Sequence, residues 1–470
     1  MARGGASEQA AKTTFRDVFA VAEFRALWLA QLLSVAGDQL ARVALTILVY
    51  DRTRSALLAA ITFVVSIVPA FVGGITLAWL ADHYPRRRVM IACDVVRAVL
   101  VLVMALPGMP IAAMVALLFV VTLAGAPFIS ARAALYPDVL TGDSYLMGTA
   151  VTLTTFQFAQ VLGFAAGGAI VGLFGIRTSL VVDAATFVVS ALIVQAWVRV
   201  RPAPVTLTGR AARPSRSAGV IAGTRLVFTN RTLRTTMLFG WLAAFYNAPE
   251  GVVTPLARAL GGGAIAVGVI LAAQALGETA GAIVFSRFVA APARLRSMGP
   301  LAVAASAVLV LFVWRPDLPV SLLILFASGV FAAYQLAANA AFVNAAPTEQ
   351  RSQAFGLAQG GMSLGQGTVM ILAGAVADHH SAASVIAVCG AVGAVVALAI
   401  AFSWARDQGH SDRQGQRPTL APAVAAHGVL LSLSAQENPL SNQPNVLATA
   451  VVQPSSRRRT ATPFPISAPT

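Results

Sequence analysis

Ionisable side chains inside long apolar stretches are the first feature of this chain that could carry chemistry. Asp38 and Arg42 lie one helical turn apart in one such stretch, and Glu250 and Glu278 lie in two later ones. A charge in hydrocarbon is costly unless it is paired or hydrated, so such groups mark ion or substrate pathways by default. Asp38 and Arg42 share a helix face and can pair, which makes them either a structural ion pair or a site for a proton or a cationic substrate group. Glu278 has no basic neighbour at helical spacing, so it is the better candidate for a proton carrier.

Amide side chains in the same stretches could bind a substrate. Gln157, Asn247 and Gln274 could donate and accept hydrogen bonds across a cavity between helices. The alternative is that each amide holds one helix to the next, because amides also form hydrogen bonds between helices in membranes. For any single amide this second interpretation is favoured.

A second group of charges follows a tight turn and indicates a gate. An acid, a Tyr-Pro turn and a basic cluster occur in succession, and a further acid and base lie one helical turn apart shortly after them. Opposite charges at a moving helix junction can form a two-state latch; the alternative is a basic anchor followed by a solvated turn. The predicted cytoplasmic gate consists of Asp82, Arg86, Arg87, Arg88, Asp94, Arg97 and Arg132.

The elements that must position these groups are membrane-spanning helices. Of 470 residues, 57% are hydrophobic and only 11% are charged, whereas soluble domains are about 25% charged. A helix needs about 20 apolar residues to cross the hydrocarbon core. The sequence predicts twelve such helices, at 24–50, 55–81, 89–109, 111–134, 146–173, 176–198, 233–257, 264–288, 298–314, 319–345, 354–377 and 383–404.

The basic residues predict how the helices are oriented. The loops placed outside carry only Arg52, Arg54, Arg177, Arg258 and Arg315, whereas the arginine clusters fall in the loops on the other side. Basic residues are retained on the cytoplasmic side of a membrane. We therefore expect both termini to be cytoplasmic. The net charge of +15 is explained by arginines that orient the helices in the membrane, and it does not indicate nucleic-acid binding.

Three residue types exclude several classes of protein. Lys12 is the only lysine, and no glycine-rich loop precedes it. A P-loop ATPase and a lysine Schiff base are therefore both excluded. Cys93 and Cys389 lie far apart in apolar stretches, which indicates structural thiols rather than a disulfide or a zinc site. The five histidines show no metal-binding or catalytic spacing, so neither a metal, a cofactor nor an enzymatic activity is expected.

The longest hydrophilic segment between apolar stretches divides the predicted helices six and six. Its second half, 217–234, places apolar residues among arginines, as in an amphipathic surface helix. The alternative to a linker is an ordinary long loop. The predicted organisation is a cytoplasmic N-terminal segment 1–23, a six-helix bundle 24–198, a cytoplasmic linker 199–232, a second six-helix bundle 233–405 and a disordered cytoplasmic tail 406–470.

The stretch around Asp82 resembles the signature loop of the major facilitator superfamily, Gly-x-Leu-Ala-Asp-Arg-x-Gly-Arg-Arg. The chain matches this signature at Leu80, Ala81, Asp82, Arg86 and Arg87, and departs from it at Ala78, His83 and Pro85. Further stretches are similar to the siderophore and macrolide exporters of that superfamily; they are 24–28, 37–38, 94–97, 131–138 and 183–187. The resemblance covers about residues 15–405 and implies twelve helices in two pseudo-symmetric bundles, a central cavity and alternating access.

These observations together predict a multi-pass transporter of the bacterial inner membrane. We expect a monomeric all-α protein that exports a small molecule, such as a drug, antibiotic or siderophore, in exchange for protons. Asp38, Arg42, Gln157, Asn247, Glu250, Gln274 and Glu278 are expected to line its proton and substrate cavity. Its expected partners are the lipid bilayer, the substrate and protons. The alternatives are a nutrient importer of the same fold and a membrane sensor or scaffold that transports nothing.

Overall fold

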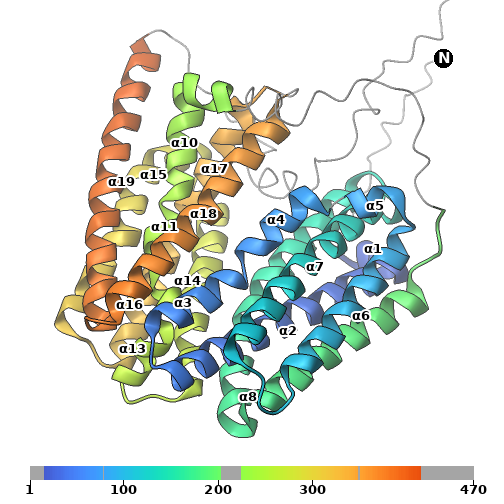
Figure 1. Ribbon diagram of the computed structural model, residues 1–470. Coiled ribbons are helices and arrows are strands. Elements are labelled where there is room, and N and C mark those ends of the chain that lie inside the picture. Colours follow the sequence, from blue (N-terminus) through green and yellow to red (C-terminus); the bar gives the residue numbers. More distant parts are fainter. Residues whose placement is uncertain (1–14, 78, 203–223, 348–349, 414–470) are drawn as a thin grey trace, which may run out of the picture. The chain divides into compact units, whose positions relative to one another are not determined.

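The computed structural model describes residues 15–77, 79–202, 224–347 and 350–413. Within these ranges every regular element is a helix (Figure 1), which confirms the predicted all-α class. Most of the predicted N-terminal segment, linker and tail, at 1–14, 203–223 and 414–470, lies outside the described residues.

The helices follow the predicted apolar stretches along the chain (Figure 1). The first half contains α1 (Phe15–Ala20), α2 (Ala22–Thr53), α3 (Ala56–Val65), α4 (Val68–Thr76), α5 (Trp79–His83), α6 (Arg86–Met104), α7 (Ile111–Val139) and α8 (Asp143–Trp197). The second half contains α10 (Arg231–Trp241), α11 (Ala243–Tyr246), α12 (Ala248–Gly251), α13 (Val253–Ala259), α14 (Ala264–Phe288), α15 (Ala291–Ala307), the 3-10 helix η1 (Val308–Trp314), α16 (Leu318–Phe331), α17 (Tyr334–Ala345), α18 (Arg351–Ala377) and α19 (Ala382–Arg413). Helix α19 continues to Arg413, so the predicted start of a disordered tail at 406 is wrong.

The helices of the described residues do not confirm the predicted number of membrane spans. The described residues contain nine helical stretches that are long and apolar enough to cross a membrane. Helix α6 is not among them, since it carries four arginines and Asp94. The predicted span 233–257 is also missing from the nine, because it is divided into the short helices α10 to α13. The twelve spans therefore stay a prediction, as does the cytoplasmic location of the termini.

Helix α8 covers two predicted spans. Its 55 residues would extend about 80 Å if straight, far more than the hydrocarbon thickness of about 30 Å. The helical backbone is interrupted at Gly175, which has φ 83° and ψ 170°. Glycine is the residue that adopts such a conformation without steric cost. The two arms, 143–174 and 176–197, match the fifth and sixth predicted spans.

Prolines explain why two other predicted spans are divided. Pro69 lies in the first turn of α4, and Pro249 lies in the first turn of α12. Proline has no backbone N–H and clashes with the carbonyl four residues earlier, so it starts helices more readily than it continues them. The predicted spans 55–81 and 233–257 accordingly become successions of short helices.

Glycines allow several helices to approach closely. A β-carbon at Gly277 or Gly281 of α14 would overlap the main chain of α16, at the carbonyls of Phe326 and Val330 respectively. A β-carbon at Gly168 of α8 would lie 2.7 Å from the α-carbon of Gly268 in α14. Small residues at Gly168, Gly277 and Gly281 thus permit the close backbone packing that is typical of helices in membranes.

The outward-facing side chains are those of a protein surrounded by lipid. Large apolar residues are exposed along the long helices, among them Leu162, Leu192, Leu323, Leu372 and Val395. Scattered apolar residues are normal on a soluble surface, but extended apolar faces mark interaction surfaces. In helices of this length the matching partner is hydrocarbon.

Polar contacts join the two halves of the chain at helix ends. Arg258 of α13 donates to both carboxylate oxygens of Asp51 in α2, at 2.9 and 2.7 Å. Asp378, directly after α18, accepts a 2.9 Å hydrogen bond from the Ser55 hydroxyl and further bonds from the first backbone N–H groups of α3. The charge pattern predicts that these ends face outside. We call Asp51, Arg258, Ser55 and Asp378 the outer latch.

Candidate functional site

The ion pair of Asp38 is formed with α6 and not with Arg42. Arg97 donates through one Nη to Asp38 and through the other to the Ser34 hydroxyl at 3.0 Å. The guanidinium also lies over the ring of Phe187 in α8, 4.0 Å from its centroid. Asp38 and Arg42 lie within electrostatic range of each other, but the ion pair found for Asp38 among the described residues is the one with Arg97 of the facing helix.

Asp94 and Arg97 are buried within the first half of the chain. Arg97 lies eleven residues beyond Arg86 on α6, or about 16 Å along the helix. Asp94 is fully buried and accepts a 2.6 Å hydrogen bond from the Ser190 hydroxyl of α8. These two residues are thus separated from the arginine cluster that they were predicted to join, because their partners come from α2 and α8.

A third carboxylate belongs to the same group. Asp183 of α8 is 0% exposed and lies within electrostatic range of Asp38 and Arg97. The absence of a side chain at Gly37 makes room for it, because a β-carbon there would overlap Asp183 and Thr186. We call Ser34, Asp38, Asp94, Arg97, Asp183 and Ser190 the N-terminal ion cluster. Asp183 lies in the stretch 183–187, which contributes to the family resemblance, and an acid inside an apolar stretch is itself a signal of a buried ionisable site.

The remaining predicted gate residues bind elsewhere. Arg86 donates to Asp138 at 2.9 Å and to the main-chain oxygen of Ala134, both in α7. Arg87 donates to the main-chain oxygen of Gln195. Arg88 is exposed and Asp82 is partly exposed. Among the described residues no ion pair joins Asp82 to these arginines, so the gate stays a prediction.

Arg132 is a buried cation at the same end of α7. It is 8% exposed, and its guanidinium lies 5.7 Å from the ring centroid of Tyr136 on its own helix. An aromatic face attracts a cation that is partly removed from water. The Arg132 side chain therefore contacts a ring on its own helix, and among the described residues it forms no ion pair with Asp82.

A second polar group is built on the broken helix of the second half. Because Glu250 N–H bonds to the main-chain oxygen of Asn247 instead of that of Tyr246, the Tyr246 carbonyl is released from the helical ladder. The Gln274 side-chain amide of α14 donates to this carbonyl at 3.2 Å and to Asn247 Oδ1 at 2.7 Å. Irregular backbone inside a membrane protein needs such substitutes, and broken helices are typical of transporter binding sites.

Arg42, Glu250 and Glu278 bring charge to this second group. Arg42 of α2 lies within electrostatic range of Glu250 of α12, so the interaction spans the two halves of the chain. Its guanidinium donates to the main-chain oxygen of Ser66 at 3.2 Å and lies 5.4 Å from the ring centroid of Phe63. Glu278 of α14 lies within electrostatic range of Glu250. All three charged side chains are partly exposed.

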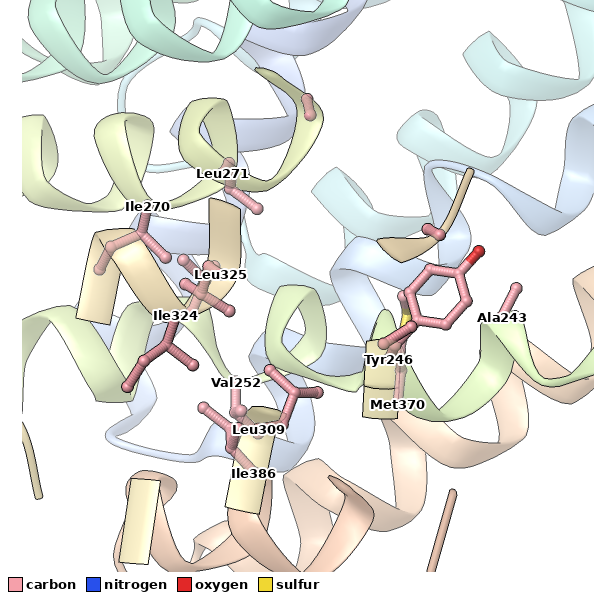
Figure 2. Close-up of a cluster of buried hydrophobic side chains, with 14 of the residues drawn as sticks. Ala243, Tyr246, Val252, Ile270, Leu271, Leu309, Ile324, Leu325, Met370 and Ile386 are labelled. Atoms are coloured by element: carbon pink, nitrogen blue, oxygen red, sulfur yellow. The ribbon is translucent and has the colours of Figure 1, made fainter. Parts of the chain in front are cut away.

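Two residues that the sequence analysis missed complete this group. Gln335 of α17 donates to the Tyr246 hydroxyl at 3.3 Å and to the main-chain oxygen of Gly240 at 3.1 Å. Figure 2 shows Tyr246 beside Ala243 and Met370, with its hydroxyl directed away from the aliphatic side chains of Val252, Leu309 and Ile386. We call Arg42, Tyr246, Asn247, Glu250, Gln274, Glu278 and Gln335 the central polar group. No contact in the described part of the chain joins Gln157, on α8, to it.

An ion pair fixes the end of α8. Arg201 donates to both carboxylate oxygens of Glu23 at the start of α2, with Nη2 to Oε2 at 3.0 Å. Hydrogen bonding to this carboxylate raises the pKa of Arg201 further above its usual range. The pair joins α2 to the segment after α8.

An apolar cavity of about 760 Å³ lies apart from both polar groups. It is bounded by the last turns of α2, by α3 and by the first part of α7, with Val49, Leu58, Ile61, Val115 and Phe119 in its wall. Its only polar lining residues are Thr53 and Thr62. It has no ionisable side chain, so it does not contain the chemistry that the two polar groups offer.

Long apolar helices with buried charges define a polytopic membrane protein. The sequence profile of the Major Facilitator Superfamily matches residues 27–254 and 249–453. The chain belongs to this family.

Solved structures with a similar fold are transporters. A POT family transporter in complex with 5-aminolevulinic acid has a TM-score of 0.66 at 10% identity, with 84% of this chain and 98% of that chain covered. The nucleoside transporter NupG has a TM-score of 0.62 at 15% identity, covering 82% and 99%. A bacterial homolog of the human lysosomal transporter Spinster, inward-facing and occupied, has a TM-score of 0.59 at 16% identity, covering 85% and 98%. A search of curated protein sequences finds no match. At these identities the likeness concerns the fold.

Proposed function

We propose that this chain is a proton-coupled exporter of a small molecule and that the central polar group is its binding and coupling site. The observation that carries the proposal is the position of Glu250 directly after a helix break, with Glu278 of α14 within electrostatic range and Arg42 contributed by the other half of the chain. A carboxylate in this setting can hold either a proton or a cationic group of a substrate, and competition between the two couples their movements.

The residues around these charges are mostly engaged with one another. Phe63 and Phe164 flank the Arg42 guanidinium but are themselves buried, so they hold this cation in place. Gln274 and Gln335 donate to the broken helix, and Asn247 Oδ1 accepts from Gln274. Glu278 has no ion pair within the described residues, so it is the carboxylate that we assign to the proton.

The direction of transport rests on the sequence similarity to siderophore and macrolide exporters. The outer latch supports alternating access, since its two carboxylates hold the halves together at one end by contacts that a conformational change can break. Import is the alternative, because the similar structures include a nucleoside transporter and a peptide transporter.

Everted membrane vesicles test the proposal. With an acidic lumen, we expect uptake of at least one of three probes, ethidium, erythromycin or enterobactin, and the uptake should collapse when an uncoupler is added. Uptake that is indifferent to the uncoupler would refute proton coupling. Accumulation only in right-side-out vesicles would refute export and support import. Vesicles with Asp317→Asn, which keeps a helix cap remote from both polar groups, serve as the matched control.

A further inference from the structure

The N-terminal ion cluster contains more acid than base. Asp38, Asp94 and Asp183 surround a single guanidinium, that of Arg97, between α2, α6 and α8. The proposed coupling site, the central polar group, does not use any of these residues. If all four were ionised, the cluster would hold two uncompensated negative charges in the membrane interior.

Asp183 is the carboxylate without a partner. It is 0% exposed, and neither of its carboxylate oxygens accepts a hydrogen bond from the described protein. The Thr186 hydroxyl lies close to this carboxylate, but it donates to the main-chain oxygen of Asp183 at 2.7 Å. An ionised carboxylate in such surroundings is strongly disfavoured.

The groups that face Asp183 come from two helices. Helix α2 contributes Asp38, and α6 contributes Arg97. About one turn before Arg97 on α6, Cys93 and Asp94 lie within its electrostatic range. Asp94 has its own donor in Ser190. Arg97 is already committed to Asp38 and Ser34, so it does not neutralise Asp183 in this conformation.

Asp38 and Asp183 differ in exposure. The Asp38 side chain is 37% exposed, whereas that of Arg97 is 4% exposed and Asp183 is 0% exposed. Asp38 is therefore the aspartate at which we place the entry and exit of the proton. In the described part of the chain no group of three His, Cys, Asp or Glu side chains is placed to hold a metal ion, which favours a proton as the ligand.

We propose that Asp183 is a second proton-binding residue and that one proton and the Arg97 guanidinium exchange places between Asp183 and Asp38. In the conformation described here, Asp183 carries the proton and Arg97 pairs with ionised Asp38. In the alternative state the O–H bond at Asp183 is broken, the proton resides on Asp38, and Arg97 pairs with ionised Asp183. The net charge of the three groups is zero in both states, so the exchange needs no buried net charge.

The exchange links protonation to helix position. Asp38 lies on α2, Arg97 on α6 and Asp183 on α8, so a change of partner alters which of these helices Arg97 holds together. The effect of this proton exchange on transport rests on the proposed function, in which transport is coupled to protons. The protonation states themselves can be measured whether or not transport is coupled to protons.

Infrared spectroscopy of the purified full-length protein in lipid nanodiscs tests the exchange. The wild type, with its aspartates labelled with ¹³C at the side-chain carboxyl, should show at neutral pH a carboxylic-acid carbonyl band that shifts with the label. Asp183→Asn should remove this band, and Asp317→Asn should retain it. The proposal would be overturned if the folded wild type showed no aspartic-acid band. It would also be overturned if the band were lost in Asp94→Asn and retained in Asp183→Asn.

A second variant tests the exchange even if Asp183→Asn does not fold. Asp38→Asn imitates protonated Asp38, so Arg97 should turn to Asp183 and the Asp183 band should disappear although Asp183 is present. Persistence of the band in Asp38→Asn would mean that Asp183 is a permanently neutral structural acid. If the infrared results are as expected but uncoupler-sensitive transport is absent, the proposed function fails and the proton exchange stands.

Discussion

Asp378 of the second half accepts a 2.9 Å hydrogen bond from Ser55 at the N-terminus of α3 in the first half. Its carboxylate also accepts bonds from backbone N–H groups in the first turn of that helix. A carboxylate at this position satisfies unpaired backbone donors and interacts favourably with the helix dipole. A cap supplied by another part of the chain can be withdrawn, which makes it a conformational contact as well as a stabilising one.

We predict that Asp378→Ala shifts the protein away from the latched conformation. The exposed cap contributes about 1 kcal/mol, so the population ratio should change about fivefold. Spin labels across the outer ends of α3 and α18 would report the shift as a longer distance. Asp317→Ala is the matched control, because Asp317 caps α16 within one half. A similar distance change in both variants would contradict the prediction.

We predict that Glu278→Gln separates binding from proton coupling. The amide imitates the protonated acid in shape but cannot release a proton. Substrate exchange between equal pools in proteoliposomes should persist, while proton-driven accumulation of the same probe should fall at least tenfold. Unchanged accumulation would remove Glu278 from the coupling step. Loss of both activities with normal folding would instead assign it to substrate binding.

We predict that Gln274→Leu destabilises the broken helix. The change leaves the Tyr246 carbonyl and Asn247 Oδ1 without their donor, at a cost of about 1 to 3 kcal/mol. A lower melting temperature of the detergent-solubilised protein would confirm this. Ser286→Ala on the same helix removes an exposed hydroxyl that bonds only within α14, and it should leave the melting temperature unchanged.

We predict that Gly277→Ala is more damaging than its size suggests. The added methyl would overlap the Phe326 carbonyl of α16 and force α14 and α16 apart, at a cost of about 1 to 3 kcal/mol. Thermal unfolding measures the loss. At Gly74 of α4 the added carbon would meet nothing within 4 Å, so Gly74→Ala should be neutral or slightly stabilising. Equal stabilities of the two variants would contradict the close packing of α14 and α16.

The sequence by itself determined the class of the protein. Long apolar stretches cannot form a soluble surface, and backbone polar groups in hydrocarbon must be satisfied within helices. This is why α14 and α18 lie close to the predicted ranges. The sequence also indicated Glu250, Gln274 and Glu278 as candidate site residues, because a polar residue in an apolar stretch is conspicuous in any context.

Only the tertiary structure decided which of these residues meet. Spacing along one helix favoured a pair between Asp38 and Arg42, but Arg97 of a facing helix forms the ion pair instead. Likewise Asp94 and Arg97 have their partners on α8 and α2, and Asp183 of α8 lies within electrostatic range of Arg97 on a different helix. Periodicity reports the face of a helix on which a residue lies. The partner depends on which other helix packs against that face, and that is a property of the whole fold.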